Sequence, residues 1–159
     1  MSYKIGQGFD VHQLELNLPF ILGGVDIDFN KGIKAHSDGD ILIHAIIDSI
    51  LGALNLGDIG THFPSSSKWE NSSGTIMLKH ISELLLLKKY HIINIDTTII
   101  AQAPKLLSYI HDMKSNISNI LKIDKNKISI KATTTDYLGF IGKGEGIAVQ
   151  AICLIHNGE

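Results

Sequence analysis

Residues 36–60, with the sequence HSDGDILIHAIIDSILGALNLGDIG, decide the fold of this chain. From residue 41 to residue 54, apolar side chains cover most of a helical wheel, and this pattern predicts a buried helix. Residues 37–40 have the character of a cap at its start, and residues 55–57 are of the types that end a helix. The other elements are expected to pack around this helix.

One polar stripe runs along the predicted helix. Asp40, His44 and Asp48 lie four residues apart, so they share one face. A solvent-facing stripe on an amphipathic helix is the simpler interpretation, but this helix is too apolar for it. Buried carboxylates and an imidazole need partners, because unpaired desolvated charge is costly. The stripe therefore predicts a metal site or a polar cleft.

The composition indicates one globular domain over residues 1–159. Apolar residues make up 44% of the chain, charged residues make up 19%, and the net charge is −2. This balance gives no sign of a nucleic-acid partner or a membrane partner. The chain contains no arginine, so a phosphate group would have to be bound by lysine, backbone amides or a metal.

The cysteine content and the N-terminus predict a cytoplasmic protein. Cys153 is the sole cysteine, so no disulfide can form within the chain, and its apolar surroundings predict a buried strand thiol. The first residues lack an apolar signal segment, and no stretch is long enough to span a bilayer. A plastid or other organellar form trimmed of its transit peptide is the alternative.

Hydrophobic periodicity predicts an α/β fold of the α+β sandwich type. Strands are expected at 3–12, in a hairpin of two short strands at 19–30, and at about 92–102, 128–135 and 146–155; further helices are expected at about 73–90 and from Pro104 onwards. The pattern suggests a mixed sheet with three helices packed on one face. The opposite face would then need a cover, which self-association would supply.

A second pair of polar residues joins the helical stripe to form a candidate metal site. Asp10 and His12 are two residues apart on a predicted strand, so both side chains leave the same face. With His44 they offer one carboxylate and two imidazoles, which suits zinc and leaves a fourth tetrahedral position open. Asp40 and Asp48 are then expected to hydrogen-bond the His44 ring and fix its tautomer.

Several segments could bind phosphate. His36 and Ser37 precede a helix N-terminus, although a simple cap would explain them equally well. Residues 133–136 and the glycine loop around Lys143 offer hydroxyls and amides, although a threonine-rich strand with a turn is the alternative. Residues 101–105 join a strand end to an expected helix start, and residues 58–60 could bind ligand hydroxyls or form a turn. Together these features predict metal-assisted chemistry on a phosphorylated substrate.

Six blocks of the sequence resemble the 2-C-methyl-D-erythritol 2,4-cyclodiphosphate synthase family of the non-mevalonate isoprenoid pathway. They occur in the family's order and span nearly the whole chain: GFDVH at 8–12, AHSDGDILIHAIIDSILGA at 35–53, LGDIGTHFP at 56–64, TTIIAQAPK at 97–105, IKATTTDYLGF at 130–140 and GKGEGIA at 142–148. The resemblance implies a homotrimer with active sites at the subunit interfaces and the open sheet face buried inside. The implied reaction converts 4-diphosphocytidyl-2-C-methyl-D-erythritol 2-phosphate into the cyclic diphosphate and CMP.

The resemblance also implies roles for individual residues. Asp10, His12 and His44 resemble the ligands of one catalytic zinc ion per subunit, and Asp136 stands where the family holds a second divalent cation, Mg²⁺ or Mn²⁺. His36 and Thr134 match the stabilisers of the transition state. The implied substrate-binding residues are Asp10, His12, His36, Ser37, Asp58, Gly60, Phe63, Ser65, Ser67, Ala101, Ala103, Pro104, Lys105, Leu106, Leu107, Thr133, Thr134, Thr135, Asp136, Phe140 and Lys143.

The sequence departs from the family pattern at three places. Serines occupy 65–67 where aspartates are usual, Asp136 replaces a glutamate, and Lys143 replaces an arginine and so lacks the planar fork of a guanidinium. Two other functions compete with the synthase. One is a trimeric phosphate-binding protein with a structural metal, and the other is a zinc-dependent phosphohydrolase with Asp40 or Asp48 as its base.

Overall fold

The protein is built on a five-stranded mixed sheet with the strand order β4-β1-β7-β5-β6. The computed structural model describes residues 2–65, 68, 69 and 71–158. Strands β5 and β6 are parallel, and the other neighbours are antiparallel. The strands are β1 (Tyr3–Leu16), β4 (Lys31–Ile33), β5 (His91–Ile100), β6 (Ile128–Thr133) and β7 (Gly146–His156).

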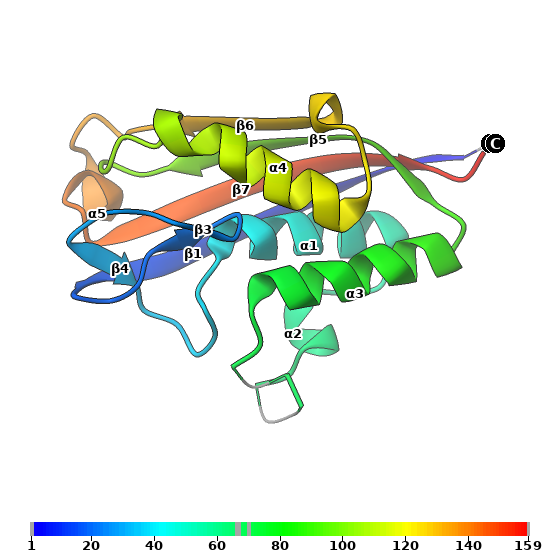
Figure 1. The fold of residues 1–159 in the computed structure, drawn as a ribbon, viewed down its shortest axis with the longest axis horizontal. Coiled ribbons are helices and arrows are strands. Elements are labelled where there is room, and N and C mark those ends of the chain that lie inside the picture. Colours follow the sequence, from blue (N-terminus) through cyan, green and yellow to red (C-terminus); the bar gives the residue numbers. More distant parts are fainter. Residues whose placement is uncertain (1, 66–67, 70, 159) are drawn as a thin grey trace.

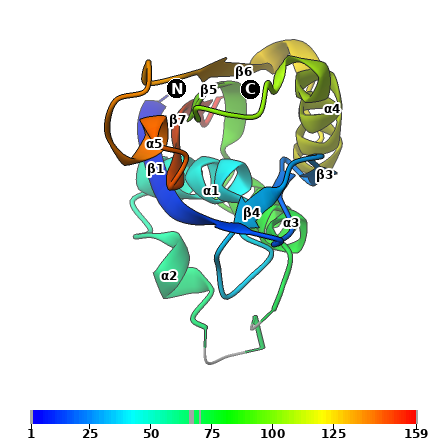
Figure 2. The same ribbon diagram turned by 90° about the vertical axis from the view of Figure 1, so that its left-hand side faces the viewer.

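The three long helices lie on one side of this sheet, as predicted (Figures 1 and 2). Helix α1 (Ile41–Leu54) packs on β1 and β7, and α4 (Ile110–Leu121) packs on β6. Helix α3 (Gly74–Leu87) contacts α1 and α4 and forms an outer layer. The sheet curls around α1, whose side chains from Ile41 to Ile47 are all buried.

The opposite face of the sheet is exposed in the single chain. Alternation along the strands turns Ile5, Phe9 and Val11 of β1 outward, together with Ile152 of β7. Their exposed fractions run from 40% to 72%, which is high for large apolar side chains. This is the face that the sequence predicted to need a cover.

Two glycines bring α1 against β1. A Cβ atom at Gly6 would lie 1.7 Å from the carbonyl oxygen of Ser49, and one at Gly8 would lie 1.9 Å from that of Ala45. No side chain fits there, so the helix backbone lies directly on the strand. Because side chains alternate along β1, Asp10 and His12 leave the same face as the two glycines and point towards the start of α1.

The structure corrects one helix start. The helix expected from Pro104 begins at Ile110, after a 3₁₀ turn, η1 (Leu107–Tyr109), and the bond between Ala103 and Pro104 is cis. Leu106 is buried, but Leu107 is 83% exposed, and the buried side chains of α4 itself begin only at Met113. Leu106 is the one buried side chain among residues 104–109, which is too little to stabilise a further helical turn, so α4 does not extend back to Pro104.

The other elements are short. The hairpin expected around Gly23 and Gly24 is present as β2 (Ile21–Leu22) and β3 (Val25–Asp26). The sequence interpretation missed β4 and several single turns: α2 (Ile59–His62), α5 (Gly139–Gly142) and η2 (Lys125–Lys127). Among the described residues, every helix is too short or too polar to cross a bilayer. Cys153 is buried in β7, as expected.

Candidate active site

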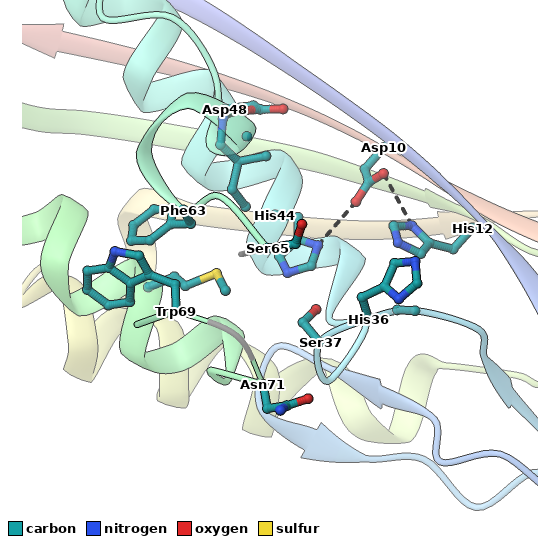
Figure 3. Close-up of a pocket in the computed structure, with 14 residues that line it drawn as sticks. Asp10, His12, His36, Ser37, His44, Asp48, Phe63, Ser65, Trp69 and Asn71 are labelled. Atoms are coloured by element: carbon teal, nitrogen blue, oxygen red, sulfur yellow. Dashed lines mark hydrogen bonds and ion pairs between the residues drawn. The ribbon is translucent and has the colours of Figure 1, made fainter. Parts of the chain in front are cut away.

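Asp10 and His12 of β1 and His44 of α1 point towards one another (Figure 3). The Oδ1 atom of Asp10 lies 3.2 Å from Nδ1 of His12, and its Oδ2 atom lies 3.3 Å from Nδ1 of His44. The trio predicted from two distant parts of the sequence is therefore one cluster, with its candidate ligand atoms within 4.8 Å of one another.

The spacing of these atoms fits a metal ion. Zinc bonds of about 2.0–2.2 Å in a tetrahedron place neighbouring ligand atoms about 3.3–3.6 Å apart, close to the two separations found here. The Nδ1 atom of His12 is buried and lies near Asp10 without the geometry of a hydrogen bond, and Nε2 of His44 is buried without a hydrogen-bond partner. A buried nitrogen without a hydrogen bond is costly, and a metal would satisfy the one on His12.

Charge in the trio is already arranged for a cation. Burial acts to raise the pKa of Asp10, but the contacts with His12 and His44 outweigh it and hold this pKa at about 2. Burial acts to lower the pKa of His44, whereas the Asp10 carboxylate raises it above the usual 6.5. Without a metal, the carboxylate thus stays ionised and draws a proton onto His44.

The expectation that Asp40 and Asp48 hydrogen-bond the His44 ring is wrong. Asp40 is fully buried, and its carboxylate accepts hydrogen bonds from the amides of Gly23, Gly24 and Ile43 at 2.9, 2.7 and 3.1 Å. It therefore caps α1 and ties the β2–β3 hairpin to it. Burial raises the pKa of Asp40 to about 6.

Asp48 instead serves a different segment. Its Oδ1 atom accepts a hydrogen bond from the amide of Ile59 at 2.7 Å, which fixes the first turn of α2. Asp58 caps this turn by accepting hydrogen bonds from the amide and the hydroxyl of Thr61, both at 2.8 Å. Residues 58–60 therefore form a turn that α1 holds in place.

Two hydrogen bonds hold the loop before α1. The Oδ2 atom of Asp38 accepts a hydrogen bond from the amide of Gly74 at 2.9 Å, so the loop is attached to the start of α3. Within the loop, the Ser37 hydroxyl accepts one from the amide of Gly39 at 3.2 Å. The α1 cap is thus Asp40, which leaves His36 and Ser37 to line the neighbouring cleft.

A cleft of about 1120 Å³ opens beside the candidate metal ligands Asp10, His12 and His44. Its lining residues are Asp10, His12, Ala35, His36, Ser37, His44, Asp48, Ile59, Gly60, Phe63, Ser65, Trp69, Asn71 and Met77. Figure 3 shows the trio and His36 at one end and Phe63 and Trp69 at the other. The cleft therefore has a polar end suited to a metal and anions, and a more apolar end.

Phe63 is among the residues expected to bind substrate, but its packing with Trp69 and His80 at this end was not predicted. Phe63 and Trp69 pack edge to face with ring centroids 4.7 Å apart, and His80 of α3 lies 5.2 Å from Trp69. This cluster attaches the loop after α2 to α3. The two aromatic residues and His80 are 6 to 17 positions apart without helical spacing, so no periodic signal marks them as neighbours.

The second predicted cluster does not line this cleft in the described part of a single chain. Residues 101–107 and 133–143 are absent from its lining, and Ser67 lies outside the described residues. Figure 2 shows α5 and the end of β6 in the upper part of the molecule and α2 at the bottom. The two groups of implied substrate-binding residues are therefore separate within one chain.

The second cluster has its own ordered geometry. The amide of Ala101 donates to the carbonyl oxygen of Thr133 at 2.9 Å, which joins the ends of β5 and β6. The amide of Asp136 donates to the Thr134 hydroxyl at 3.2 Å. The Asp136 side chain is exposed, and one carboxylate together with substrate phosphates is a usual way to hold Mg²⁺.

Comparisons with known proteins match nearly the whole chain to one family. A model described as the YgbB family matches residues 3–156. A relative in Clostridium kluyveri, named 2-C-methyl-D-erythritol 2,4-cyclodiphosphate synthase, is 57% identical over 155 residues, which cover 97% of this chain and 94% of the relative. One of the same name in Francisella philomiragia is 51% identical over 159 residues, covering 99% and 100%.

Solved structures show the same fold. The bifunctional IspDF of Campylobacter jejuni matches with a TM-score of 0.92 at 43% identity; the match covers 97% of this chain but 42% of that longer chain. IspF of Plasmodium falciparum in complex with CDP matches with a TM-score of 0.87 at 40% identity, covering 97% of this chain and 96% of that one. The mixed sheet with its helices is thus a fold on which a cytidine nucleotide has been seen to bind.

Proposed function

The chain belongs to the YgbB family, and on that premise we propose that it converts 4-diphosphocytidyl-2-C-methyl-D-erythritol 2-phosphate into 2-C-methyl-D-erythritol 2,4-cyclodiphosphate and CMP. The observation that carries the proposal is the cluster of Asp10, His12 and His44 at one end of a large cleft. Curated relatives that bear the name of this synthase support the choice of substrate.

The proposed reaction is a cyclisation within one molecule, carried out by a phosphorus–oxygen lyase. An oxygen of the 2-phosphate forms a bond with the β-phosphorus, the bond from that phosphorus to the α–β bridging oxygen breaks, and CMP leaves with that oxygen. Since both reacting groups belong to one substrate, the protein needs to orient them and to stabilise the developing charge. The reaction requires neither a side-chain nucleophile nor water.

We assign each end of the cleft a role in orienting the substrate. Asp10, His12 and His44 would hold a zinc ion, which when bound would withdraw negative charge from the β-phosphate. His36 and Ser37, which line the same end, would bind phosphate oxygens. Gly60, Phe63 and Ser65 would surround the methylerythritol part, with Asp58 and Ser67 as further contacts expected from the family.

The cytidine end of the substrate is proposed to bind a neighbouring subunit. Residues 101–107 and 133–136 of one chain lie away from the cleft of that same chain, so a homotrimer with shared sites would bring the two groups together. The exposed apolar residues Ile5, Phe9 and Val11 support burial of this sheet face between subunits. Phe140 and Lys143 would lie near the surfaces where the subunits of this homotrimer meet.

The remaining parts of the proposal concern the second metal and the location. Asp136 would hold Mg²⁺ or Mn²⁺, which when bound would offset negative charge on the substrate phosphates, and Thr134 would stabilise the transition state with its hydroxyl. A cytoplasmic location fits a substrate and a product that carry several phosphate charges and do not cross membranes unaided.

Phosphorus NMR of the purified protein with the diphosphocytidyl substrate, zinc and magnesium tests the function. We expect the cyclic diphosphate and CMP to appear together and in equal amounts. Release of inorganic phosphate would instead indicate a phosphohydrolase. Binding of zinc and CDP without turnover would indicate a phosphate-binding protein, and either result would refute the synthase.

A further inference from the structure

The turn that carries Asp136 contains two neighbouring residues in the left-handed region. The φ angles are 49° at Asp136 and 64° at Tyr137, and neither residue is glycine. A non-glycine residue avoids this region because its Cβ atom crowds the backbone, and bulky residues avoid it more than aspartate does. Two such residues in sequence require contacts that hold the turn.

The hydrogen bonds of the turn itself leave the Tyr137 amide to an outside partner. The amide of Leu138 donates to the carbonyl oxygen of Thr135 at 3.0 Å. In return, the Thr135 hydroxyl donates to the carbonyl oxygen of Leu138 at 2.7 Å. The amide of Asp136 donates to the Thr134 hydroxyl. The Tyr137 amide donates to Oε1 of Gln102 at 3.0 Å, across 35 positions of sequence.

The backbone that leads into Gln102 is held in place independently of this contact. Gln102 follows directly after Ala101, whose amide bonds to the carbonyl oxygen of Thr133 and so fixes the ends of β5 and β6 together. Gln102 itself is half-buried. The Tyr137 side chain is 79% exposed, so packing of its ring does little to hold the backbone. The backbone of Tyr137 also lies directly against Gly142, where no side chain would fit, and the Gln102 side chain adds a hydrogen bond that secures the left-handed conformation from outside the turn.

We propose that Gln102 is a positioning residue, which holds the backbone of Tyr137 in the left-handed region and thereby directs the Asp136 carboxylate towards the second divalent cation. This inference rests on the proposed function only for the identity of the cation site. Gln102 touches neither the cation nor a reacting atom; it acts through the direction of the turn.

The test compares variants that separate the hydrogen bond from the backbone strain. Gln102→Met keeps the size of the side chain and removes the acceptor. Tyr137→Gly removes the cause of the strain, whereas Tyr137→Ala removes the same exposed ring and keeps the Cβ atom, so it is the matched control. The readout is the affinity for Mn²⁺, measured by water-proton relaxation with the zinc-loaded protein and CDP as a non-reacting nucleotide.

We expect Gln102→Met to weaken Mn²⁺ binding about fivefold to tenfold, the range that corresponds to one lost hydrogen bond. Adding Tyr137→Gly should restore the affinity to within about twofold of wild type, and adding Tyr137→Ala should not. Zinc content should be unchanged in all variants. Unchanged Mn²⁺ affinity in Gln102→Met, or equal restoration by glycine and alanine, would overturn the inference, as would no Mn²⁺ binding by the wild-type protein.

Activity assays on the same proteins separate this inference from the proposed function. If the wild-type protein releases no CMP while the Mn²⁺ affinities follow the expected order, the reaction is wrong and the role of Gln102 stands. If the protein is active and Gln102→Met needs no more Mg²⁺ than wild type, the role of Gln102 is wrong and the reaction stands.

Discussion

The Oδ1 atom of Asp48 accepts a hydrogen bond from the backbone amide of Ile59 at 2.7 Å. The contact joins the middle of α1 to the first turn of α2, eleven residues later in the chain. With Asp40 bonded to the β2–β3 hairpin and His44 beside Asp10, each member of the polar stripe of α1 attaches a different segment. The stripe therefore acts as a set of anchors around the cleft.

Replacing Asp48 should separate an anchoring role from a proton-transfer role. Asp48→Asn keeps an oxygen that can accept the Ile59 hydrogen bond, whereas Asp48→Ala does not. We expect kcat/KM to fall about tenfold in Asp48→Ala, chiefly through KM, and to fall less than about threefold in Asp48→Asn. Steady-state kinetics of CMP release would measure both. Equal and large losses of kcat would show that the carboxylate acts as a base.

His44→Ala should remove the metal and leave the fold in place. The substitution takes away one of three ligands, and two are too few for tight zinc binding. We expect zinc content to fall from about one ion per chain to less than about a tenth, with the far-ultraviolet circular dichroism unchanged. His111→Ala, at an exposed position on α4, is the control and should keep its zinc. Retention of zinc by the His44 variant would refute the assignment.

Asp136→Ala should spare zinc and abolish the response to the second metal. Asp136 is not a member of the zinc trio, so zinc content should match wild type. Stimulation of CMP release by added Mg²⁺ or Mn²⁺ should disappear, because the carboxylate proposed to hold this cation is gone. A titration with each cation at fixed zinc would measure this, and unchanged metal dependence would exclude Asp136 from the second site.

The buried carboxyl of Asp40 should make stability fall as the pH rises through the range from about 4 to about 6. Burial raises its folded-state pKa from 3.8 to about 6, so the folded protein binds a proton more tightly than the unfolded chain. The stabilisation is complete below pH 3.8 and is lost as the pH passes the folded value, with a change on the order of 2–3 kcal/mol.

Urea unfolding of the metal-free protein at several pH values would measure this contribution. Asp40→Asn has no titrating group, so its stability should vary less between pH 4 and 7, although it is less stable overall because its amide nitrogen cannot accept a backbone hydrogen bond. The lowered pKa of Asp10 acts at more acidic pH and does not obscure the window. The same slope in both proteins would contradict the prediction.

The two glycines of β1 should tolerate no side chain. Gly8→Ala would place a methyl group 1.9 Å from the carbonyl oxygen of Ala45, so helix and strand would have to separate. We expect a loss of more than about 3 kcal/mol in the free energy of unfolding, together with weaker zinc binding. Gly52→Ala is the control, since its methyl group would meet nothing closer than 3.7 Å, and it should stabilise α1 by about 0.5–1 kcal/mol. Similar stabilities for the two variants would argue against the close contact.

What the sequence predicted depended on periodicity. Spacings of two on β1 and four on α1 were enough to place Asp10, His12 and His44 on facing surfaces, and the structure confirms that they meet. The same spacing predicted the wrong partners for Asp40 and Asp48, because their hydrogen bonds go to amides of the hairpin and of α2. Periodicity shows which face a side chain leaves, but it does not show which loop will fold over that face.

The missed features share that cause. Trp69, Phe63 and His80 come together through a loop with no regular period, and the contact between Gln102 and Tyr137 joins residues 35 positions apart. The start of α4 was misplaced because Pro104 suits the first turn of a helix, whereas the repeated burial at helical spacing that stabilises the helix lies between Met113 and Leu121.

The pairing of β1 with β7 has a consequence for chains that fold with the two strands misaligned. Eleven consecutive residue pairs, from Tyr3 with His156 to Gln13 with Gly146, set the alignment of the two strands. A slip by one residue would turn Asp10 and His12 to the outer face and press Gln7 and Phe9 against the backbone of α1, where no side chain fits. A misaligned strand would thus lose the packing of α1 and the candidate metal ligands at once, so only correctly aligned chains can bring Asp10, His12 and His44 together.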